Sequence, residues 1–328
     1  MNRLSASAGE LMEEAVSAAG FSGSVALTDG KAVVWKKAYG TANREECLPF
    51  STATPTYLAS VSKQFTAAAI LQLQQDGKLC IEDPVSLYLN GLPECMQEVR
   101  IRHLLQHTSG IPDYYQLVSP APGFTNRDVL DIVQKLDTLQ FTPGDRHDYS
   151  NTGYVLLSQI VESVSGISFG DFLKRNIFDK LGMCSSAVMD EAAELPSGKA
   201  ISYAEDGKAA DYSFRTTGGG GIYSTADDLL LWHRALKNGT VISRDLLEME
   251  AWQPAVLQSG DTSFYGLGWR IDPKEPVVVW HEGTLEGYRT FFLHDDRRNL
   301  SVIVLNNSSY PDLEELGREL YLMLKERK

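Results

Sequence analysis

The sequence predicts an α/β (α+β) fold in which both ends of the chain build one antiparallel sheet, flanked by N- and C-terminal helices, and the middle forms a mostly helical lobe. Strand-like runs occur near the N-terminus and again in the last third of the chain, and the segments between them are mostly helical. Strands far apart in sequence can share a sheet when the intervening segment folds beside it. We therefore expect residues 1–78 and 216–328 to form a sheet lobe and residues 79–215 a helical lobe, with the functional site between them.

The N-terminal part of the chain is predicted to form a helix, a hairpin and a second helix. An amphipathic stretch at about residues 7–19 suits the first helix. Two β-prone runs, residues 24–27 and 32–35, flank Asp29–Gly30, a dipeptide that is typical of tight hairpin turns. The second helix runs from about Ser60 to Gln75, where apolar residues recur at helical spacing.

The remaining elements follow from breaks and alternation in the sequence. Between residues 79 and 215, proline and glycine residues separate helical segments. The last third contains four β-rich runs, at residues 265–271, 277–281, 290–293 and 300–305. An amphipathic helix at about residues 311–324 closes the chain.

The composition argues against several classes of function. A chain of 328 residues with 43% hydrophobic content can build a large core. Its net charge of -13 would repel nucleic acids and anionic membrane surfaces, so we expect neither as a partner. The four cysteines show no paired spacing, so the sequence indicates free thiols and no zinc site.

The sequence also lacks the patterns of membrane and secreted proteins. No stretch approaches the roughly 18 apolar residues that a membrane-spanning helix needs. The first 20 residues lack the basic and apolar regions of a signal peptide. We therefore expect a cytoplasmic protein.

Ser60 and Lys63 are the first candidate site residues. Ser60 lies where a loop becomes a helix, so the positive end of the helix can stabilise a developing anion, and its backbone N–H can form half of an oxyanion hole. Lys63 is three residues further along and lies on the same helical face. A lysine base must lose its proton near neutral pH, which burial and a nearby cation favour. A capping serine followed by a solvated lysine is the alternative.

Tyr149 and Asn151 form the second candidate cluster. They lie between a Pro-Gly-Asp turn and a predicted helix that starts near Thr152. A phenol can relay a proton, and an amide can hold either a substrate carbonyl or Lys63. The rival match, Tyr88–Asn90, lies in an apolar run and is better explained by packing.

The third candidate cluster follows a β-run at residues 277–280. His281 is placed to donate a proton or to keep the base network poised. Gly283 would let a substrate approach the strand backbone closely. The backbone N–H of Thr284 could supply the second oxyanion donor. A histidine that is satisfied within a sheet is the alternative.

Three further patterns are set aside. Residues 166–170 fit a nucleophile-elbow pattern but lack the preceding buried strand, so the serine is better read as a helix cap. Residues 218–221 resemble a phosphate loop without the required Lys-Ser/Thr. His103 and His107 have the spacing of zinc ligands on a helix, but no third ligand accompanies them, and we expect both to be structural.

These residues resemble the class C β-lactamase-like superfamily of serine hydrolases. This group includes class C β-lactamases, D-Ala-D-Ala carboxypeptidases of the low-molecular-weight penicillin-binding kind, D-aminopeptidases and family VIII carboxylesterases. The similarity covers nearly the whole chain. The matching segments are the Ser-x-x-Lys helix at 59–66, Leu-Leu-x-His-Thr-Ser-Gly at 104–110, Tyr-x-Asn at 149–151, and a Gly-rich loop with its helix at 219–229.

The resemblance implies a β-lactamase/transpeptidase-like fold and a role for each candidate residue. Ser60 would be the nucleophile, and Lys63 and Tyr149 would share the general-base role. Asn151 would orient the substrate, and His281 would take the place of the lysine or histidine in the third motif.

Glu282 and its neighbours Gly283 and Thr284 are expected to contact the substrate, and Glu282 departs from the family pattern. Relatives that bind a substrate carboxylate commonly carry threonine at this position. An anionic Glu282 would oppose such a carboxylate by about 4 kcal/mol at about 4 Å and an effective dielectric constant of about 20. The sequence therefore predicts a preference for esters or for amides with a free amine, unless Arg289 or Arg270 pairs with Glu282 or reaches the carboxylate.

The predicted activity is that of a ping-pong serine hydrolase. Ser60 would be acylated by an ester, amide, peptide or β-lactam, and water would then release the acyl group. A D-Ala-D-Ala carboxypeptidase (penicillin-binding protein) or a β-lactamase is the nearest alternative, and an acylatable sensor without turnover is the second. No metal or organic cofactor is implied, and the oligomeric state is left open.

Overall fold

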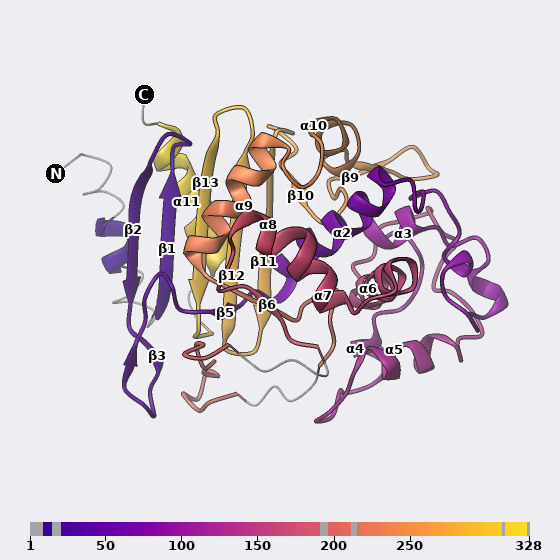
Figure 1. Ribbon diagram of the computed structural model, residues 1–328, viewed down its shortest axis with the longest axis horizontal. Helices are drawn as coiled ribbons and strands as arrows, with labels where there is room; N and C mark the ends of the chain where they lie inside the picture. The colour runs from indigo at the N-terminus through magenta and orange to yellow at the C-terminus, as the bar shows by residue number, and fades with distance from the viewer. Residues whose placement is uncertain (1–8, 15–20, 191–195, 211–214, 310–311, 327–328) are drawn as a thin grey trace.

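A six-stranded antiparallel sheet lies beside a mostly helical region in a computed structural model that describes residues 9–14, 21–190, 196–210, 215–309 and 312–326 (Figure 1). The strand order is β10-β11-β12-β13-β1-β2. The strands are β1 (Gly23–Thr28), β2 (Val33–Tyr39), β10 (Arg270–Ile271), β11 (Val278–Leu285), β12 (Tyr288–Asp295) and β13 (Leu300–Asn306). β1 pairs directly with β13, so both ends of the chain build one sheet and the predicted fold is confirmed.

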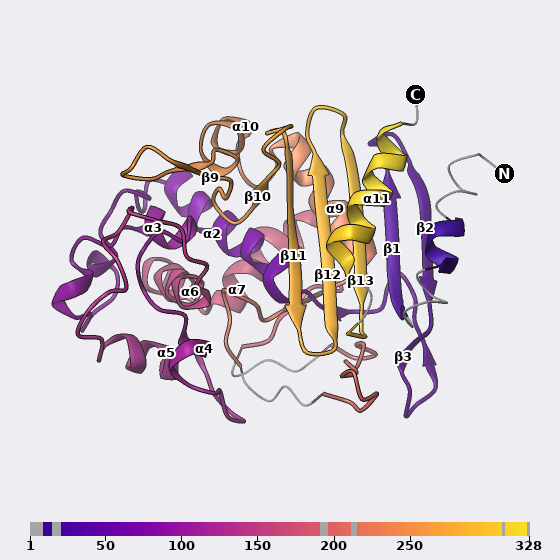
Figure 2. The same ribbon diagram turned by 180° about the vertical axis from the view of Figure 1, so that it is seen from behind.

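Helices cover both faces of this sheet. α11 (Leu313–Lys325) lies on one face, as Figure 2 shows, and α9 (Ala226–Asn238) lies on the other. Along β13, Val302 and Val304 pack in the core beneath α11, while the alternate residues Ile303 and Leu305 pack in the core that includes α9. Every position of β13 is buried, which explains why its sequence is apolar throughout rather than alternating.

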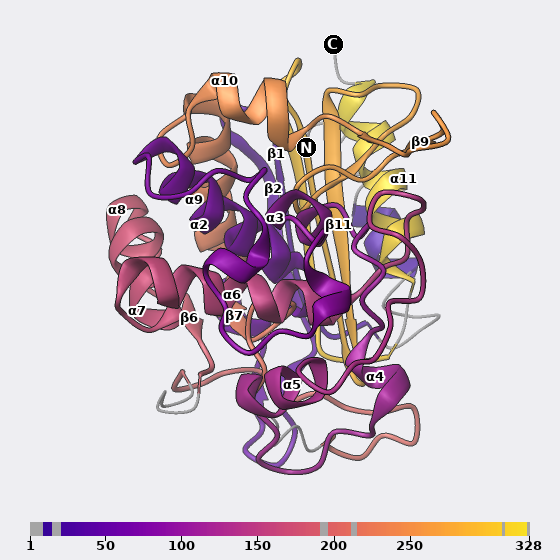
Figure 3. The same cartoon turned by 90° about the vertical axis from the view of Figure 1, so that its right-hand side faces the viewer.

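The helical region occupies the other end of the molecule and faces the viewer in Figure 3. Its helices are α3 (Ile101–Leu105), α4 (Tyr114–Leu117), α5 (Asn126–Val133), α6 (Asn151–Ser165), α7 (Phe169–Leu173) and α8 (Asp179–Leu181). α2 (Lys63–Gln75) contacts α6, and its apolar residues belong to the core shared by the sheet and the helices. The lobe boundaries at residues 78 and 216 stay predictions.

Short elements complete the described chain. Small sheets are formed by β3 (Thr41–Asn43) with β4 (Leu48–Pro49), by β5 (Thr56–Tyr57) with β7 (Ile222–Ser224) and β6 (Ala187–Val188), and by β8 (Ala255–Val256) with β9 (Thr262–Ser263). Short helical segments are η1 (Ala59–Ser62), η2 (Val85–Leu87), η3 (Glu94–Met96), η4 (Lys174–Phe178), α10 (Arg244–Leu246) and η5 (Leu247–Ala251). The pairing of β5 with β7 brings the segment before Ser60 next to the Gly-rich loop that precedes β7.

Some predicted boundaries differ from the structure. Residues 9–14 are helical, and the rest of the predicted first helix lies outside the described residues. The predicted strand at 265–271 is reduced to β10, because the chain turns before it at Gly268, which has a φ of +91°. The predicted hairpin at residues 24–35 and the helical cap at Ser168 are confirmed. Among the described residues, no helix combines the length and the apolar character that crossing a membrane requires.

Candidate active site

Ser60 lies in η1, the single helical turn that leads directly into α2. Ala59 immediately before it has a φ of +47°, in the left-handed region that residues other than glycine seldom adopt. This conformation lets the chain leave β5 and turn sharply before α2 begins. Ser60 consequently lies at the wall of a cavity and Lys63 one turn deeper.

Lys63 is fully buried, and its amine contacts three oxygen atoms. Its Nζ lies 3.2 Å from Ser60 Oγ, 2.8 Å from Asn151 Oδ1 and 2.7 Å from the backbone oxygen of Gly219. The structure thus brings together three residues that the sequence singled out, and adds a carbonyl group from the Gly-rich loop.

The chemistry of these three oxygens suits a base that acts on Ser60. The amide oxygen of Asn151 and the carbonyl oxygen of Gly219 can only accept hydrogen bonds. A neutral amine that donates its two N–H groups to them directs its lone pair at Ser60 Oγ. Burial lowers the pKa of Lys63 from 10.5 to about 7, so the neutral form is accessible near neutral pH.

Tyr149 lies beside this amine. Its ring centroid is 4.8 Å from Lys63 Nζ, and the ring of His107 lies on it with centroids 4.2 Å apart. The buried hydroxyl makes no hydrogen bond of good geometry among the described residues, but the hydroxyl of Ser60 lies close enough to favour the ionised form of Tyr149. Burial outweighs that effect and raises the pKa of Tyr149, so the group is a neutral phenol.

His281 lies in the middle of β11, and its surroundings argue against the predicted proton-donor role. Its Nδ1 donates to the backbone oxygen of Glu282 at 2.6 Å, because a carbonyl oxygen can only accept. Its Nε2 is then left to accept from the hydroxyl of Tyr265 at 2.9 Å. Burial lowers the pKa of His281 to about 4, so the ring is neutral and both nitrogens are occupied. This arrangement matches the alternative of a histidine satisfied within a sheet.

Glu282 is paired rather than free. The guanidinium group of Arg270 donates to both of its carboxylate oxygens at distances from 2.6 to 3.0 Å. The sequence left open a pairing of Arg270 with Glu282. This pairing neutralises the negative charge of Glu282, on which the predicted repulsion of a substrate carboxylate depended. Arg289 instead donates to the backbone oxygens of Leu285 and Tyr288.

Gly283 is required for packing within the protein. A Cβ atom at this position would overlap with the hydroxyl of Thr290 and with the backbone oxygen of Leu58. The space that the sequence analysis reserved for a substrate is therefore filled by the turn that carries Ser60. A direct contact of Gly283 with substrate stays a prediction.

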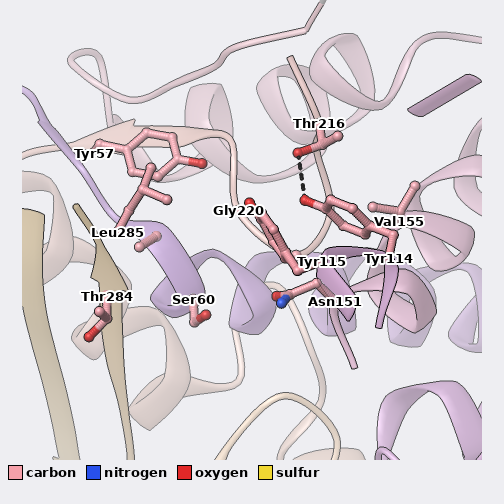
Figure 4. Close-up of a pocket in the computed structure, with 12 residues that line it drawn as sticks. Tyr57, Ser60, Tyr114, Tyr115, Asn151, Val155, Thr216, Gly220, Thr284 and Leu285 are labelled. Carbon is pink, nitrogen blue, oxygen red and sulfur yellow. Dashed lines mark hydrogen bonds between the residues drawn. The ribbon is translucent and has the colours of Figure 1, made fainter. Parts of the chain in front are cut away.

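The cavity in front of Ser60 has a volume of about 260 Å³ (Figure 4). No charged residue is among those that line it: Tyr57, Ala59, Ser60, Tyr114, Tyr115, Asn151, Val155, Thr216, Gly219, Gly220, Thr284 and Leu285. In Figure 4 Ser60 and Thr284 come from neighbouring elements at one side of the cavity, and the Tyr114 hydroxyl meets Thr216 at the other, at 3.2 Å. The predicted oxyanion hole between the N–H groups of Ser60 and Thr284 stays a prediction.

Several residues of the site were missed by the sequence analysis. Asp113 accepts hydrogen bonds from Asn151, and the hydroxyl of Tyr265 donates to His281. Gly219 lies in the Gly-rich loop that the sequence singled out, but the contact of its backbone oxygen with Lys63 was not predicted. His107, interpreted as structural, lies directly on the ring of Tyr149. A backbone carbonyl has no sequence signature, and the other contacts join segments far apart in the chain.

The described residues contain no group of three His, Cys, Asp or Glu side chains that could hold a metal ion. Among the groups that contact Lys63 Nζ are the hydroxyl of Ser60, the ring of Tyr149, the amide oxygen of Asn151 and the carbonyl oxygen of Gly219.

The fold and this site define a class of serine hydrolase, and comparison with known proteins gives the family. The Beta-lactamase family model matches residues 9–324, and the chain belongs to that family. It is a serine hydrolase that acts through a covalent acyl-enzyme.

The chain is similar to penicillin-binding proteins and to a D-aminopeptidase. Penicillin-binding protein 4* of Bacillus subtilis (strain 168) is 33% identical over 310 residues, which cover 88% of this chain and 68% of that protein. D-aminopeptidase of Gluconobacter oxydans (strain 621H) is 31% identical over 312 residues, or 90% of this chain and 58% of that enzyme. The crystal structure of the penicillin binding protein from Bacillus halodurans superimposes with a TM-score of 0.84 at 29% identity, covering 98% of this chain and 99% of the other.

Proposed function

We propose that Ser60 is the nucleophile and Lys63 the general base of an acyl hydrolase. The neutral amine takes the proton of Ser60 Oγ as that oxygen bonds to the substrate carbonyl carbon. The carbonyl oxygen becomes an oxyanion held by the N–H groups of Ser60 and Thr284. When the intermediate collapses, the bond to the leaving group breaks, and that group receives a proton through Lys63 and the Tyr149 phenol.

Release of the acyl group reverses these roles. A water molecule gives a proton to the same base and attacks the ester carbon, and Ser60 leaves with the proton restored. The observation that carries the proposal is the set of three contacts at Lys63 Nζ, two of which go to acceptor-only oxygens. Those contacts leave one direction for the lone pair of the neutral amine, and Ser60 Oγ lies there.

The substrate class that we propose is an uncharged ester or amide. The cavity at Ser60 has no charged residue in its described lining. Arg270 is paired with Glu282, and the guanidinium group of Arg289 donates to the backbone oxygens of Leu285 and Tyr288. A substrate carboxylate would therefore leave water without gaining a cationic partner, which costs free energy. The same pairing removes the reason for a preference for cationic substrates, so neutral substrates are favoured over both.

An amide with a free amine is the second candidate. The similarity to a D-aminopeptidase, at 31% identity over 90% of the chain, supports it. D-Ala-D-Ala carboxypeptidase and β-lactamase activities need a substrate carboxylate to be recognised, and the pairing of Arg270 makes both less well supported.

Intact-mass spectrometry tests the nucleophile and the substrate class together. The protein is incubated separately with p-nitrophenyl acetate, a D-amino-acid amide and nitrocefin. We expect a transient acetyl adduct and turnover with the first, weaker turnover with the second, and the least with the third. Ser60→Ala abolishes the adduct, whereas Ser62→Ala, the matched control two residues along, keeps it. An adduct on Ser60→Ala would refute the assignment, and nitrocefin turnover far above the others would refute the substrate preference.

Incubation with a fluorescent penicillin separates the enzyme from an acylatable sensor. A penicillin adduct that persists for hours with no product would favour the sensor. The cytoplasmic location expected from the sequence stays a prediction, which cell fractionation tests.

A further inference from the structure

Asp113 holds the side chain of Asn151, whose amide oxygen contacts Lys63. It is buried immediately before α4, and its Oδ2 accepts from both the backbone N–H and the side-chain Nδ2 of Asn151, each at 2.8 Å. Its Oδ1 accepts from the backbone N–H of Tyr115 at 3.0 Å. The carboxylate therefore has three donors and joins α4 to the start of α6.

The orientation of the Asn151 amide decides what Lys63 can do. An amide has an acceptor oxygen on one side and a donor nitrogen on the other. When the amide oxygen faces Lys63, the neutral amine of Lys63 donates one N–H to Asn151, and the lone pair of the amine is free to accept from Ser60. With the nitrogen towards Lys63, the amide would donate to that lone pair and compete with Ser60 for it. A carboxylate can only accept, so it fixes the nitrogen on the far side.

We propose that Asp113 is a positioning residue of the active site: its carboxylate sets the orientation of the Asn151 amide so that the amide oxygen faces Lys63 and the amine lone pair faces Ser60. The inference rests on the proposed function, in which Lys63 is the base. Asp113 acts through Asn151 and touches none of the reacting atoms.

The negative charge of Asp113 also affects the pH dependence of activity, which a residue with a purely structural role would not change. Asp113 and Glu282 raise the pKa of Lys63, and Arg270 lowers it, while burial lowers it most. The histidines that face this group, His107 and His281, have pKa values lowered by burial and are neutral. Removing the Asp113 charge therefore lowers the pKa of Lys63 and moves the acidic limb of the pH profile of kcat/KM to lower pH.

Two variants test this positioning role. Asp113→Asn keeps the shape, but its amide has a single acceptor oxygen and its NH2 group opposes the donors of Asn151. Asp113→Ser keeps an oxygen that can cap α4 but removes the second oxygen that holds Asn151. We expect each to lower kcat by about 100-fold with little change in KM, because a misplaced catalytic group costs about that factor. The acidic limb moves to lower pH in both.

The matched control is Asp128→Asn. Asp128 accepts from the backbone N–H and the hydroxyl of Thr125 at the start of α5. Asp128 is not among the described residues that line the cavity, so its loss should leave kcat and the pH profile unchanged. Thermal unfolding of every variant separates lost folding from lost catalysis. If only the cap of α4 mattered, Asp113→Ser would keep the parental activity.

A double-mutant cycle decides whether Asp113 acts through Asn151. In an Asn151→Ala background, Asp113→Asn should lower kcat/KM no further. Additive losses, or a parental rate and pH profile for Asp113→Asn, would overturn the inference even if Ser60 is acylated as proposed. Failure of Ser60 acylation in the parent protein would instead overturn the proposed function.

Discussion

Lys63 is an ordinary lysine in sequence and an unusual one in the folded protein. Its amine is fully buried against Ser60, Asn151 and Gly219, and burial outweighs the nearby carboxylates, so its pKa falls to about 7. The pKa of Tyr149 moves the other way, because burial disfavours its anion. One buried environment thus makes the ammonium form of Lys63 acidic enough to lose its proton near neutral pH, and keeps the phenol of Tyr149 protonated.

The pH dependence of kcat/KM should report this lysine. Below about pH 7 Lys63 is protonated and its lone pair is lost, so activity should rise with pH through that region and then level off. Lys63→Arg, which stays protonated, should lower kcat/KM by about 100- to 10,000-fold. Lys78→Arg, at an exposed position just after the end of α2, serves as the control and should match the parent. An unchanged acidic limb in Lys63→Arg would show that another group titrates.

At the scale of elements, the turn that carries Ser60 depends on its close approach to β11. η1 packs on β11 at Gly283, and the hydroxyl of Thr290 on β12 donates to the backbone oxygen of Leu58 at 2.7 Å. The turn is therefore fixed to β12 and to β11, whose residues Thr284 and Leu285 line the cavity. A glycine at position 283 serves this packing, which explains its place in the third motif without invoking the substrate.

Gly283→Ala should therefore affect stability and catalysis together. The added methyl group would overlap with Leu58 and Thr290, and overpacking of this kind typically costs about 1–3 kcal/mol. Since relief requires η1 to move away from β11, kcat should fall as well. Urea unfolding and steady-state kinetics measure both effects. Gly9→Ala, a helical glycine with open space around it, is the control and should change neither activity nor packing.

At the scale of the whole molecule, buried histidines make the free energy of unfolding depend on pH. The chain has six histidines, and burial, as the largest cause, lowers the pKa of each. The pKa falls from 6.5 to about 3 for His233 and to about 4 for His281. His233 and His294 form a hydrogen bond with each other through their Nδ1 atoms at 2.8 Å, and neither is among the described residues that line the cavity at Ser60.

The free energy of unfolding should consequently fall as the pH is lowered below 6.5. A histidine with a depressed pKa is neutral in the folded protein, whereas the unfolded chain takes up the proton, so stability is present above pH 6.5 and is lost as the pH falls towards the folded pKa. At pH 5 the cost is about 2 kcal/mol for each of His233 and His281, or about 4 kcal/mol together, against a typical total of about 5–15 kcal/mol.

Urea unfolding between pH 8 and pH 5 measures this loss. His233→Gln should reduce the dependence on pH by about one proton, whereas His103→Gln, at a less buried position, should reduce it less. A free energy of unfolding that is constant over this range would contradict the prediction.

The sequence by itself determined the sheet built from both ends of the chain, the helical region between them and the membership of the family. These follow from hydrophobic periodicity and short motifs, both of which are local. It also singled out Ser60, Lys63, Tyr149 and Asn151, which the structure brings together in or beside one cavity. Strand ends at residues 265–271 could not be placed, because the glycine turn there depends on packing against α2.

Only the tertiary structure decided the charge states of these residues and the orientation of their side chains. Three features depend on contacts between groups whose distance and burial the order of residues in the chain does not fix. They are the neutral state of His281, the ion pair of Glu282 with Arg270 and the hydrogen bonds from Asn151 to Asp113. A pKa or a hydrogen-bond direction is a property of the surroundings of a group in three dimensions. The sequence was therefore enough to identify which residues belong to the site, whereas their charge states and orientations depend on the folded structure.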